Sequence, residues 1–404
     1  MSIASRIHLA TVSIVLCLAI WGCRKSAEPP LPSQSPPQVD LAATTPSSSE
    51  SATDQLLALA FDTASAIPAD PHLKDRARAQ HAVVVACLKL DRPARAAEYI
   101  EKMTTWRRGE AHAELASYYA GQGQTTDAEK QLQLAGKAMA KIEEWQQDRI
   151  KVSMARAYAR LGQKEQAART LVGLGPAEQG KVTVIADGAA GVDTFDDQIK
   201  ALDQVVAPGQ YDPLRNALES YAQLYGQVYA QVDRRALVEQ RMRAVWNKVP
   251  LLLRLDLLMV MAQHAIDHQD HAAALDLVNE AQQWMDEATW PPEHRIALVA
   301  RLSVVRHRAG DSRRARSECD AAQKLFEECR ESIVNIDRAE TLCPLAEAYA
   351  ALGDHAAALA VYKKAVEQGV VNPNSRPRAE DLAGTCLSMA LHGVDPDAEL
   401  WNRM

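Results

Sequence analysis

The sequence predicts an all-α protein, an α-solenoid of about nine helical hairpins that follows a disordered tether. From Ala52 onward, apolar residues recur at helical spacing, and no strand-type alternation of useful length occurs. The chain also resembles itself after a shift of 39 residues, which is typical of stacked repeats. The composition agrees, because 47% of the residues are hydrophobic and only 5% are aromatic, which suits helices packed through Ala, Leu and Val.

Residues 1–22 are expected to be an export signal. Arg6 and His8 precede a largely apolar run over residues 9–21. This run of about thirteen residues is shorter than the roughly twenty that a membrane-spanning helix needs. A signal peptide that is removed therefore fits the pattern better than a permanent membrane span.

The apolar run ends in a short motif with a cysteine. Ile20, Trp21, Gly22 and Cys23 resemble the lipobox of bacterial lipoproteins, with Trp21 at a position that is normally small. The resemblance implies cleavage before Cys23 and acylation of its thiol, which anchors the protein to a membrane of the cell envelope, facing the periplasm. The alternative is an ordinary signal peptide with an incidental cysteine.

Residues 23–53 are expected to be the lipidated cysteine and a disordered linker. The segment is rich in Pro, Ser and Thr, so it buries too little apolar surface to order itself. Such a linker holds the folded part away from the membrane surface.

The repeat is carried by pairs of like residues 39 positions apart. They are Trp106 and Trp145, Ala116 and Ala155, Tyr119 and Tyr158, Gly123 and Gly162, Gln124 and Gln163, Ala128 and Ala167, and Leu132 and Leu171. The same layout returns as Ala346, Tyr349, Gly353 and Ala358. It predicts a helical hairpin, because Ala and Tyr share one face of a first helix, Gly ends that helix, and a small Ala lets the second helix approach closely.

Residues 345–365, LAEAYAALGDHAAALAVYKKA, resemble the tetratricopeptide repeat. Elsewhere the pattern is degenerate, and Asp91 and Gln269 replace the turn glycine. The resemblance implies a groove lined by the first helices that binds a protein or peptide partner.

We expect a capping helix near residues 54–66, an N-terminal lobe over 54–207 and a C-terminal lobe over 208–404. Pro208 and Gly209 are the predicted hinge between the lobes, with a simple turn between repeats as the alternative.

The candidate partner contacts are arginines on predicted first helices: Arg149, Arg156, Arg160, Arg301 and Arg308. Arginine forms bidentate contacts to carboxylates, so an acidic segment or one bearing a C-terminal carboxylate is the expected ligand. The alternative is a solvated helix face. The formal net charge of -7 argues against a nucleic-acid partner, which usually requires excess positive charge.

No catalytic motif is recognisable, so we expect a non-enzymatic scaffold or adaptor without a cofactor or metal. The alternative is an accessory component or a metal-dependent hydrolase that uses the 264–271 region, where His264 and His268 lie one helical turn apart. Asp267 stands where the general-base Glu of a zinc peptidase is expected, and no third ligand is identifiable.

Five cysteines follow Cys23: Cys87, Cys319, Cys329, Cys343 and Cys386. An exported location permits a disulfide, for which Cys319 and Cys343 on neighbouring predicted helices are the best pair. The alternative is that all five are reduced and act as small apolar side chains.

Acylation is predicted to depend on Cys23, because no other thiol lies in the motif. In a Cys23→Ser variant, metabolic labelling with a fatty acid should be lost and the protein should leave the membrane fraction. Labelling that persists in this variant would refute the lipid anchor.

Overall fold

A computed structural model describes residues 51–174, 194–206 and 211–404. The signal peptide, Cys23, the linker up to residue 50 and the predicted hinge at Pro208 and Gly209 lie outside the described residues. Within the described ranges the regular structure is helical, with no strand. The predicted fold class, an all-α solenoid, is confirmed.

The α-helices vary in length from four to 21 residues. In chain order they are α1 (Ala52–Ala66), α2 (Ala69–Lys89), α3 (Pro93–Lys102), α4 (Arg107–Gly121), α5 (Thr125–Ala138), α6 (Glu144–Arg160), α7 (Lys164–Thr170), α9 (Phe195–Val206), α10 (Tyr211–Gln227), α11 (Val232–Arg243), α12 (Leu251–Asp267), α13 (His271–Glu287), α14 (Pro292–Arg308), α15 (Ser312–Cys329), α16 (Asn335–Ala351), α17 (His355–Val370), α18 (Ser375–His392) and α19 (Ala398–Trp401).

The turns between paired helices confirm the predicted hairpins. The predicted turn glycines Gly123, Gly162 and Gly353 have φ values of 73°, 74° and 80°, in the left-handed region that favours glycine. Asp91 and Gln269 occupy the same place in their hairpins with φ values of 59° and 62°. The degenerate repeats therefore keep the turn geometry and accept the strain of a side chain there.

The helix contacts follow the predicted register. Ala116 and Ala155 on first helices are fully buried, as is Ala128 on a second helix. Trp106 and Trp145, which the repeat aligns, meet edge to face with ring centroids 5.4 Å apart. Equivalent residues of successive hairpins thus stack directly on one another, as a solenoid requires.

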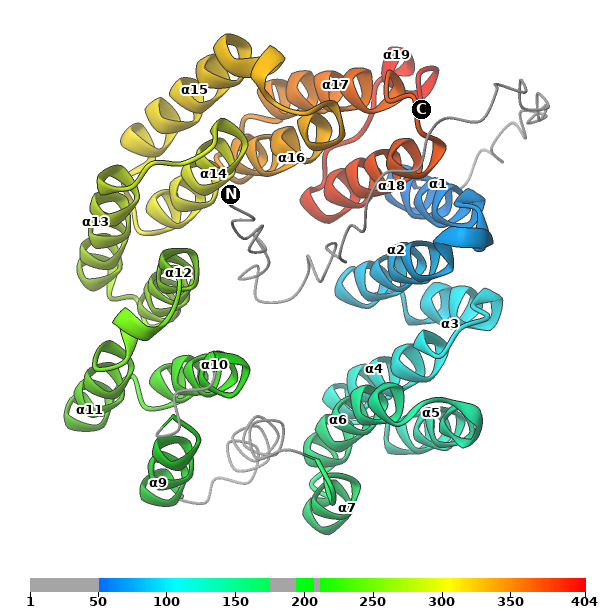
Figure 1. Cartoon of the computed structure of the whole chain (residues 1–404), viewed down its shortest axis with the longest axis vertical. Coiled ribbons are helices and arrows are strands. Elements are labelled where there is room, and N and C mark those ends of the chain that lie inside the picture. The colour runs from blue at the N-terminus through cyan, green and yellow to red at the C-terminus, as the bar shows by residue number, and fades with distance from the viewer. Residues whose placement is uncertain (1–50, 175–193, 207–210) are drawn as a thin grey trace, which may run out of the picture.

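The hairpins follow one another around a ring (Figure 1). The first helices of the hairpins, α2, α4, α6, α10, α12, α14, α16 and α18, form the inner circle, and we call them the inner helices. The second helices lie outside them. The first and last parts of the described chain lie side by side, because α1 contacts α18.

Helix α1 was predicted as a capping helix before the first hairpin, and the helix itself is confirmed. Its role differs, because α1 packs along α18 as a second helix packs along the first within a hairpin. The helix that follows α18 in the chain, α19, spans only four residues. Helix α1 therefore covers the face of α18 that a full-length second helix would cover.

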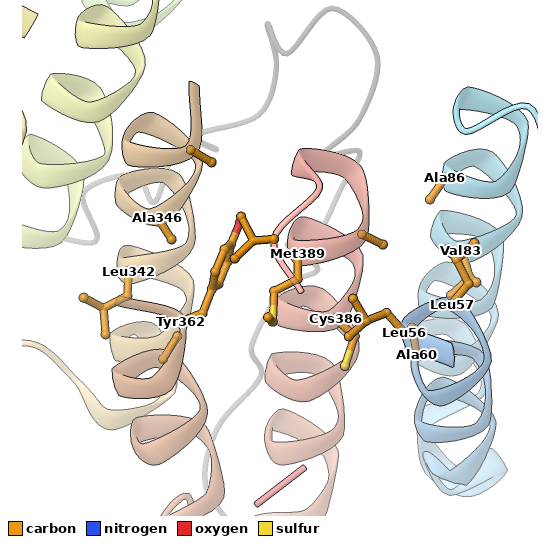
Figure 2. Close-up of a cluster of buried hydrophobic side chains, with 14 of the residues drawn as sticks. Leu56, Leu57, Ala60, Val83, Ala86, Leu342, Ala346, Tyr362, Cys386 and Met389 are labelled. Atoms are coloured by element: carbon orange, nitrogen blue, oxygen red, sulfur yellow. The ribbon is translucent and has the colours of Figure 1, made fainter. Parts of the chain in front are cut away.

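Apolar side chains hold this closure together. Leu56, Leu57 and Ala60 of α1 are buried and lie between α18, where Cys386 is drawn, and helix α2 (Figure 2). One core includes residues from α1 to α4 and from α14 to α19. Burying a Leu side chain contributes roughly 1.5–3 kcal/mol, so this short helix supplies a substantial share of the closing energy.

Helix α1 also contacts the outer helix α3. The ring of Phe61 stacks on that of Tyr99 with centroids 4.2 Å apart, and Arg95 donates a hydrogen bond to the carbonyl of Asp54 at 3.0 Å. The outer circle therefore continues through α1.

The division into lobes at residue 207 stays a prediction. The core that includes α1 joins residues from both predicted lobes. A second core covers residues 195–309. It also crosses residue 207, because α9 (Phe195–Val206) contributes to it together with helices of the predicted C-terminal lobe.

Among the helices of the described residues, none combines the length and the apolar character needed to cross a membrane.

Closure of the ring predicts that α1 stabilises α18, more than 300 positions away in the sequence. Leu57→Ala should lower the free energy of unfolding by about 2–5 kcal/mol and should reduce hydrogen-exchange protection of α18 amides.

The matched control is Leu73→Ala, because Leu73 is 45% exposed on the adjacent α2. If α18 amides keep wild-type protection in Leu57→Ala, α1 does not close the ring in solution.

Candidate functional site

The predicted arginines lie on two inner helices, with Arg149, Arg156 and Arg160 on α6 and Arg301 and Arg308 on α14. The two groups are not part of one site, because α6 and α14 lie on different parts of the ring (Figure 1).

Two of these arginines are without a protein partner in the described part of the chain. Arg149 is exposed, and neither it nor Arg156 forms an ion pair or hydrogen bond with a described residue. The Nε atom of Arg156 is buried and has no hydrogen-bond acceptor. Seven positions separate the two residues, which is two helical turns, so both guanidinium groups lie on the same side of α6.

The other three predicted arginines have partners within the protein. Arg160 donates to Oγ of Ser117 at 2.9 Å, and Arg308 donates to Oε1 of Gln263 at 3.0 Å. Arg301 forms an ion pair with the buried carboxylate of Asp256 at 2.7 Å. Arg301 therefore neutralises a buried charge, which makes it a structural residue first.

Positive charge accumulates where α4 and α6 meet. Burial lowers the pKa of Arg156, and Arg160 lowers it further, while Glu114 of α4 and Glu219 of α10 act in the opposite direction. Burial likewise lowers the pKa of Arg107 on α4, with Arg149 adding to the effect. These guanidinium groups therefore lie close enough to repel one another.

Two carboxylates and a histidine lie beside these arginines. Glu110 and Glu114 are one turn apart on α4, and His81 reaches them from α2. The Nε2 atom of His81 lies 3.1 Å from Oε2 of Glu114 and 4.0 Å from Oε2 of Glu110. Burial lowers the pKa of His81, but the charges of Glu114 and Glu110 outweigh it and the pKa is raised.

An ion network crosses the junction of α2 and α18. Arg78 donates to Asp75 at 2.7 Å and to Glu380 of α18 at 3.2 Å. Arg376 of α18 lies 3.5 Å from Asp75 and 3.2 Å from Glu380. Two arginines and two carboxylates thus join the inner helices where the ring closes.

Beyond this junction the charge becomes acidic. Burial raises the pKa of Asp381 on α18 to about 8, and Glu340, Glu380 and Asp337 raise it further by repulsion. The Oδ2 atom of Asp381 is buried without a hydrogen-bond partner. The inner helices therefore carry clustered arginines on α4 and α6 and clustered carboxyl groups on α16 and α18, with α2 between them.

His81, Glu110 and Asp381 were not among the site residues expected from the sequence. The repeat does indicate where Glu110 lies, because the 39-residue shift places it at the same position of its hairpin as Arg149. No sequence signal places α2 beside α4 with His81 in contact, nor Asp381 near Glu340.

The residues of the alternative metal site serve the packing of α10, α12 and α13. A Cβ atom on Gly226 would lie 2.4 Å from Nδ1 of His264, so His264 fills the space that glycine leaves. The ring of His268 stacks on Tyr229 with centroids 4.7 Å apart. Asp270 caps α13 through the amide of Ala273 at 3.1 Å. Within the described residues, the 264–271 segment does not bring three ligand atoms together.

All five cysteines of the described residues are free thiols, which agrees with the reduced alternative. Cys87, Cys319 and Cys386 are buried, and burial raises the pKa of each thiol, that of Cys319 to about 11. They act as small apolar side chains.

The raised pKa of Asp381 predicts a loss of stability as pH rises. The folded protein retains this proton up to about pH 8, whereas the unfolded chain releases it near the ordinary value of 3.8. Between these values the unfolded state binds fewer protons, so stability falls with pH. Asp381→Asn should therefore melt a few degrees higher than wild type at pH 9, and the gap should shrink towards pH 4.

Asp276→Asn on α13 is the matched control, because Asp276 is exposed and its substitution should change the melting temperature little. A constant gap between Asp381→Asn and wild type across this pH range would mean that Asp381 is ionised in the folded protein.

A family model for the tetratricopeptide repeat matches residues 339–368, which cover most of α16 and α17. A search of curated proteins found no match.

Proposed function

We propose that the protein is a non-catalytic scaffold or adaptor, lipid-anchored at Cys23 and facing the periplasm, that binds an acidic segment of a protein partner on its inner helices. The fold supports the general class, because stacked helical hairpins with a tetratricopeptide match generally mediate protein–protein interaction.

One observation carries the choice of binding surface. Arg149 and Arg156 share one side of α6 and have no partner among the described residues, although most arginines of the protein do. A half-buried guanidinium group without an anion is costly, so a ligand carboxylate improves its environment. Bidentate pairing to such a carboxylate supplies both affinity and orientation.

Nearby charges set the polarity of the ligand. Arg107 adds positive charge from α4, and its Nη1 atom is occupied by Glu110 at 2.9 Å. On the far side of α2, Asp337 and Glu340 disfavour a second carboxylate, and they already raise the pKa of Asp381 by repulsion. An extended segment bound along the inner helices should therefore have its acidic residues at α6 and its basic residues near α18.

The anchor rests on Cys23 and on the composition of the segment after it. The 29 residues from Cys23 to Ser51, before α1, span at most ~100 Å when fully extended. A scaffold on such a tether reaches partners near one membrane and stays concentrated there.

Loss of the unpaired arginines should abolish binding. We choose Arg149→Glu combined with Arg156→Gln. Gln is used at position 156 because Glu there would repel the neighbouring Glu114 and could disturb folding. Each charge-assisted contact is worth roughly 1.5–3 kcal/mol, so crosslinked recovery of the envelope partner should fall roughly tenfold or more. Circular dichroism and melting should change little.

The control pair is Lys130→Glu with Arg313→Glu, which are exposed on the outer helices α5 and α15. Equal recovery of the same partner by wild type, control and arginine variant would exclude α6 from the binding surface.

A further inference from the structure

We propose that His81, Glu110 and Glu114 form a binding site for a divalent transition-metal ion such as Zn²⁺. The site belongs to α2 and α4 and is separate from the 264–271 segment. It does not depend on the proposed partner binding, because the ion is tested alone.

The ligand atoms already lie together. One nitrogen of His81 and one oxygen from each of Glu110 and Glu114 are all within 4.8 Å of one another. Zinc bonds of about 2.1 Å in a tetrahedral site place ligand atoms about 3.4 Å apart. The separations of 3.1 Å and 4.0 Å between Nε2 and the two carboxylate oxygens bracket this value, so small side-chain adjustments suffice.

Unsatisfied buried atoms provide the independent sign of a ligand. His81 is only 5% exposed, and its Nε2 atom lies 3.1 Å from Oε2 of Glu114 without forming a hydrogen bond of good geometry. The Oε2 atom of Glu114 is also buried without one, although the two atoms are 3.1 Å apart. Buried polar atoms are almost always satisfied, and an ion bound between them would satisfy both.

The donor set selects the class of metal. An imidazole with two carboxylates suits Zn²⁺, Co²⁺ or Mn²⁺, whereas Ca²⁺ and Mg²⁺ prefer oxygen ligands alone. The two carboxylates neutralise the charge of the ion. Glu110 can keep its hydrogen bond from Arg107, because a carboxylate has more than one acceptor position.

The neighbouring arginines lower the affinity for the metal ion and favour an anion as its fourth ligand. Arg107 and Arg156 add positive charge near the cluster, so binding should be weaker than in an all-acidic site. Three protein ligands leave a coordination position open, and the positive surroundings favour an anionic group such as hydroxide or a carboxylate there.

The test is titration of the full chain with Co²⁺, after treatment with a chelator and its removal. We expect one equivalent to bind, with visible absorption of nitrogen and oxygen ligands and no thiolate charge-transfer band. His81→Gln and Glu114→Gln should each weaken binding at least tenfold, and Zn²⁺ should displace the Co²⁺.

His112→Gln is the matched control, because His112 is also buried on α4 but its Nδ1 atom already contacts Oε1 of Gln131 at 2.7 Å. It should bind Co²⁺ as wild type does. If His81→Gln fails to fold by circular dichroism, Glu114→Gln decides. The proposal is overturned by the absence of stoichiometric binding, by a thiolate band, or by wild-type affinity in folded Glu114→Gln.

Discussion

The structure depends on the contact between its first and last long helices. An open solenoid leaves the apolar face of each terminal hairpin exposed and needs a cap at both ends. Here α1 covers α18, and Leu56, Leu57 and Phe61 enter a core that also includes α16 and α17. One helix therefore removes two exposed ends, and the ion network between α2 and α18 aligns the inner helices at the same place.

Closure also fixes the order of charges on the inner helices. In an open array, α4 and α18 belong to opposite ends and their charges act independently. In the ring, only α2 lies between the arginines of α4 and α6 and the carboxylates of α16 and α18 (Figure 1). Arg78 interacts with Glu380 on one side and affects Arg107 on the other. Positive and acidic groups therefore lie within a few helices of one another on the inner circle.

The sequence contained most of the fold but little of the site. Hairpin periodicity and turn residues are local, so the Ala and Gly positions and even the irregular turn at Asp91 could be predicted. Closure of the ring could not be predicted, because a helix with an apolar stripe can serve either as a cap or as a second helix packed on α18. Its sequence pattern is the same in both cases. Arg149 and Arg156 were identified from their spacing, whereas the pairing of Arg301 with Asp256 depends on how α12 and α14 pack.

The same limit applies to the 264–271 segment, the alternative metal site expected from the sequence. Its residues are close in sequence but contact different neighbours. His264 packs against Gly226, His268 stacks on Tyr229, and Asp270 caps the start of α13. His81 and Glu114 are 33 positions apart, yet adjacent inner helices bring their polar atoms within 3.1 Å. In a solenoid, adjacent repeats pack on one another, so side chains about one repeat apart in the sequence come together. Candidate ligand sets are therefore better sought at that spacing than among residues clustered in one helix. Most buried polar atoms of a folded protein have hydrogen-bond partners. Exceptions to this rule occur preferentially at functional sites.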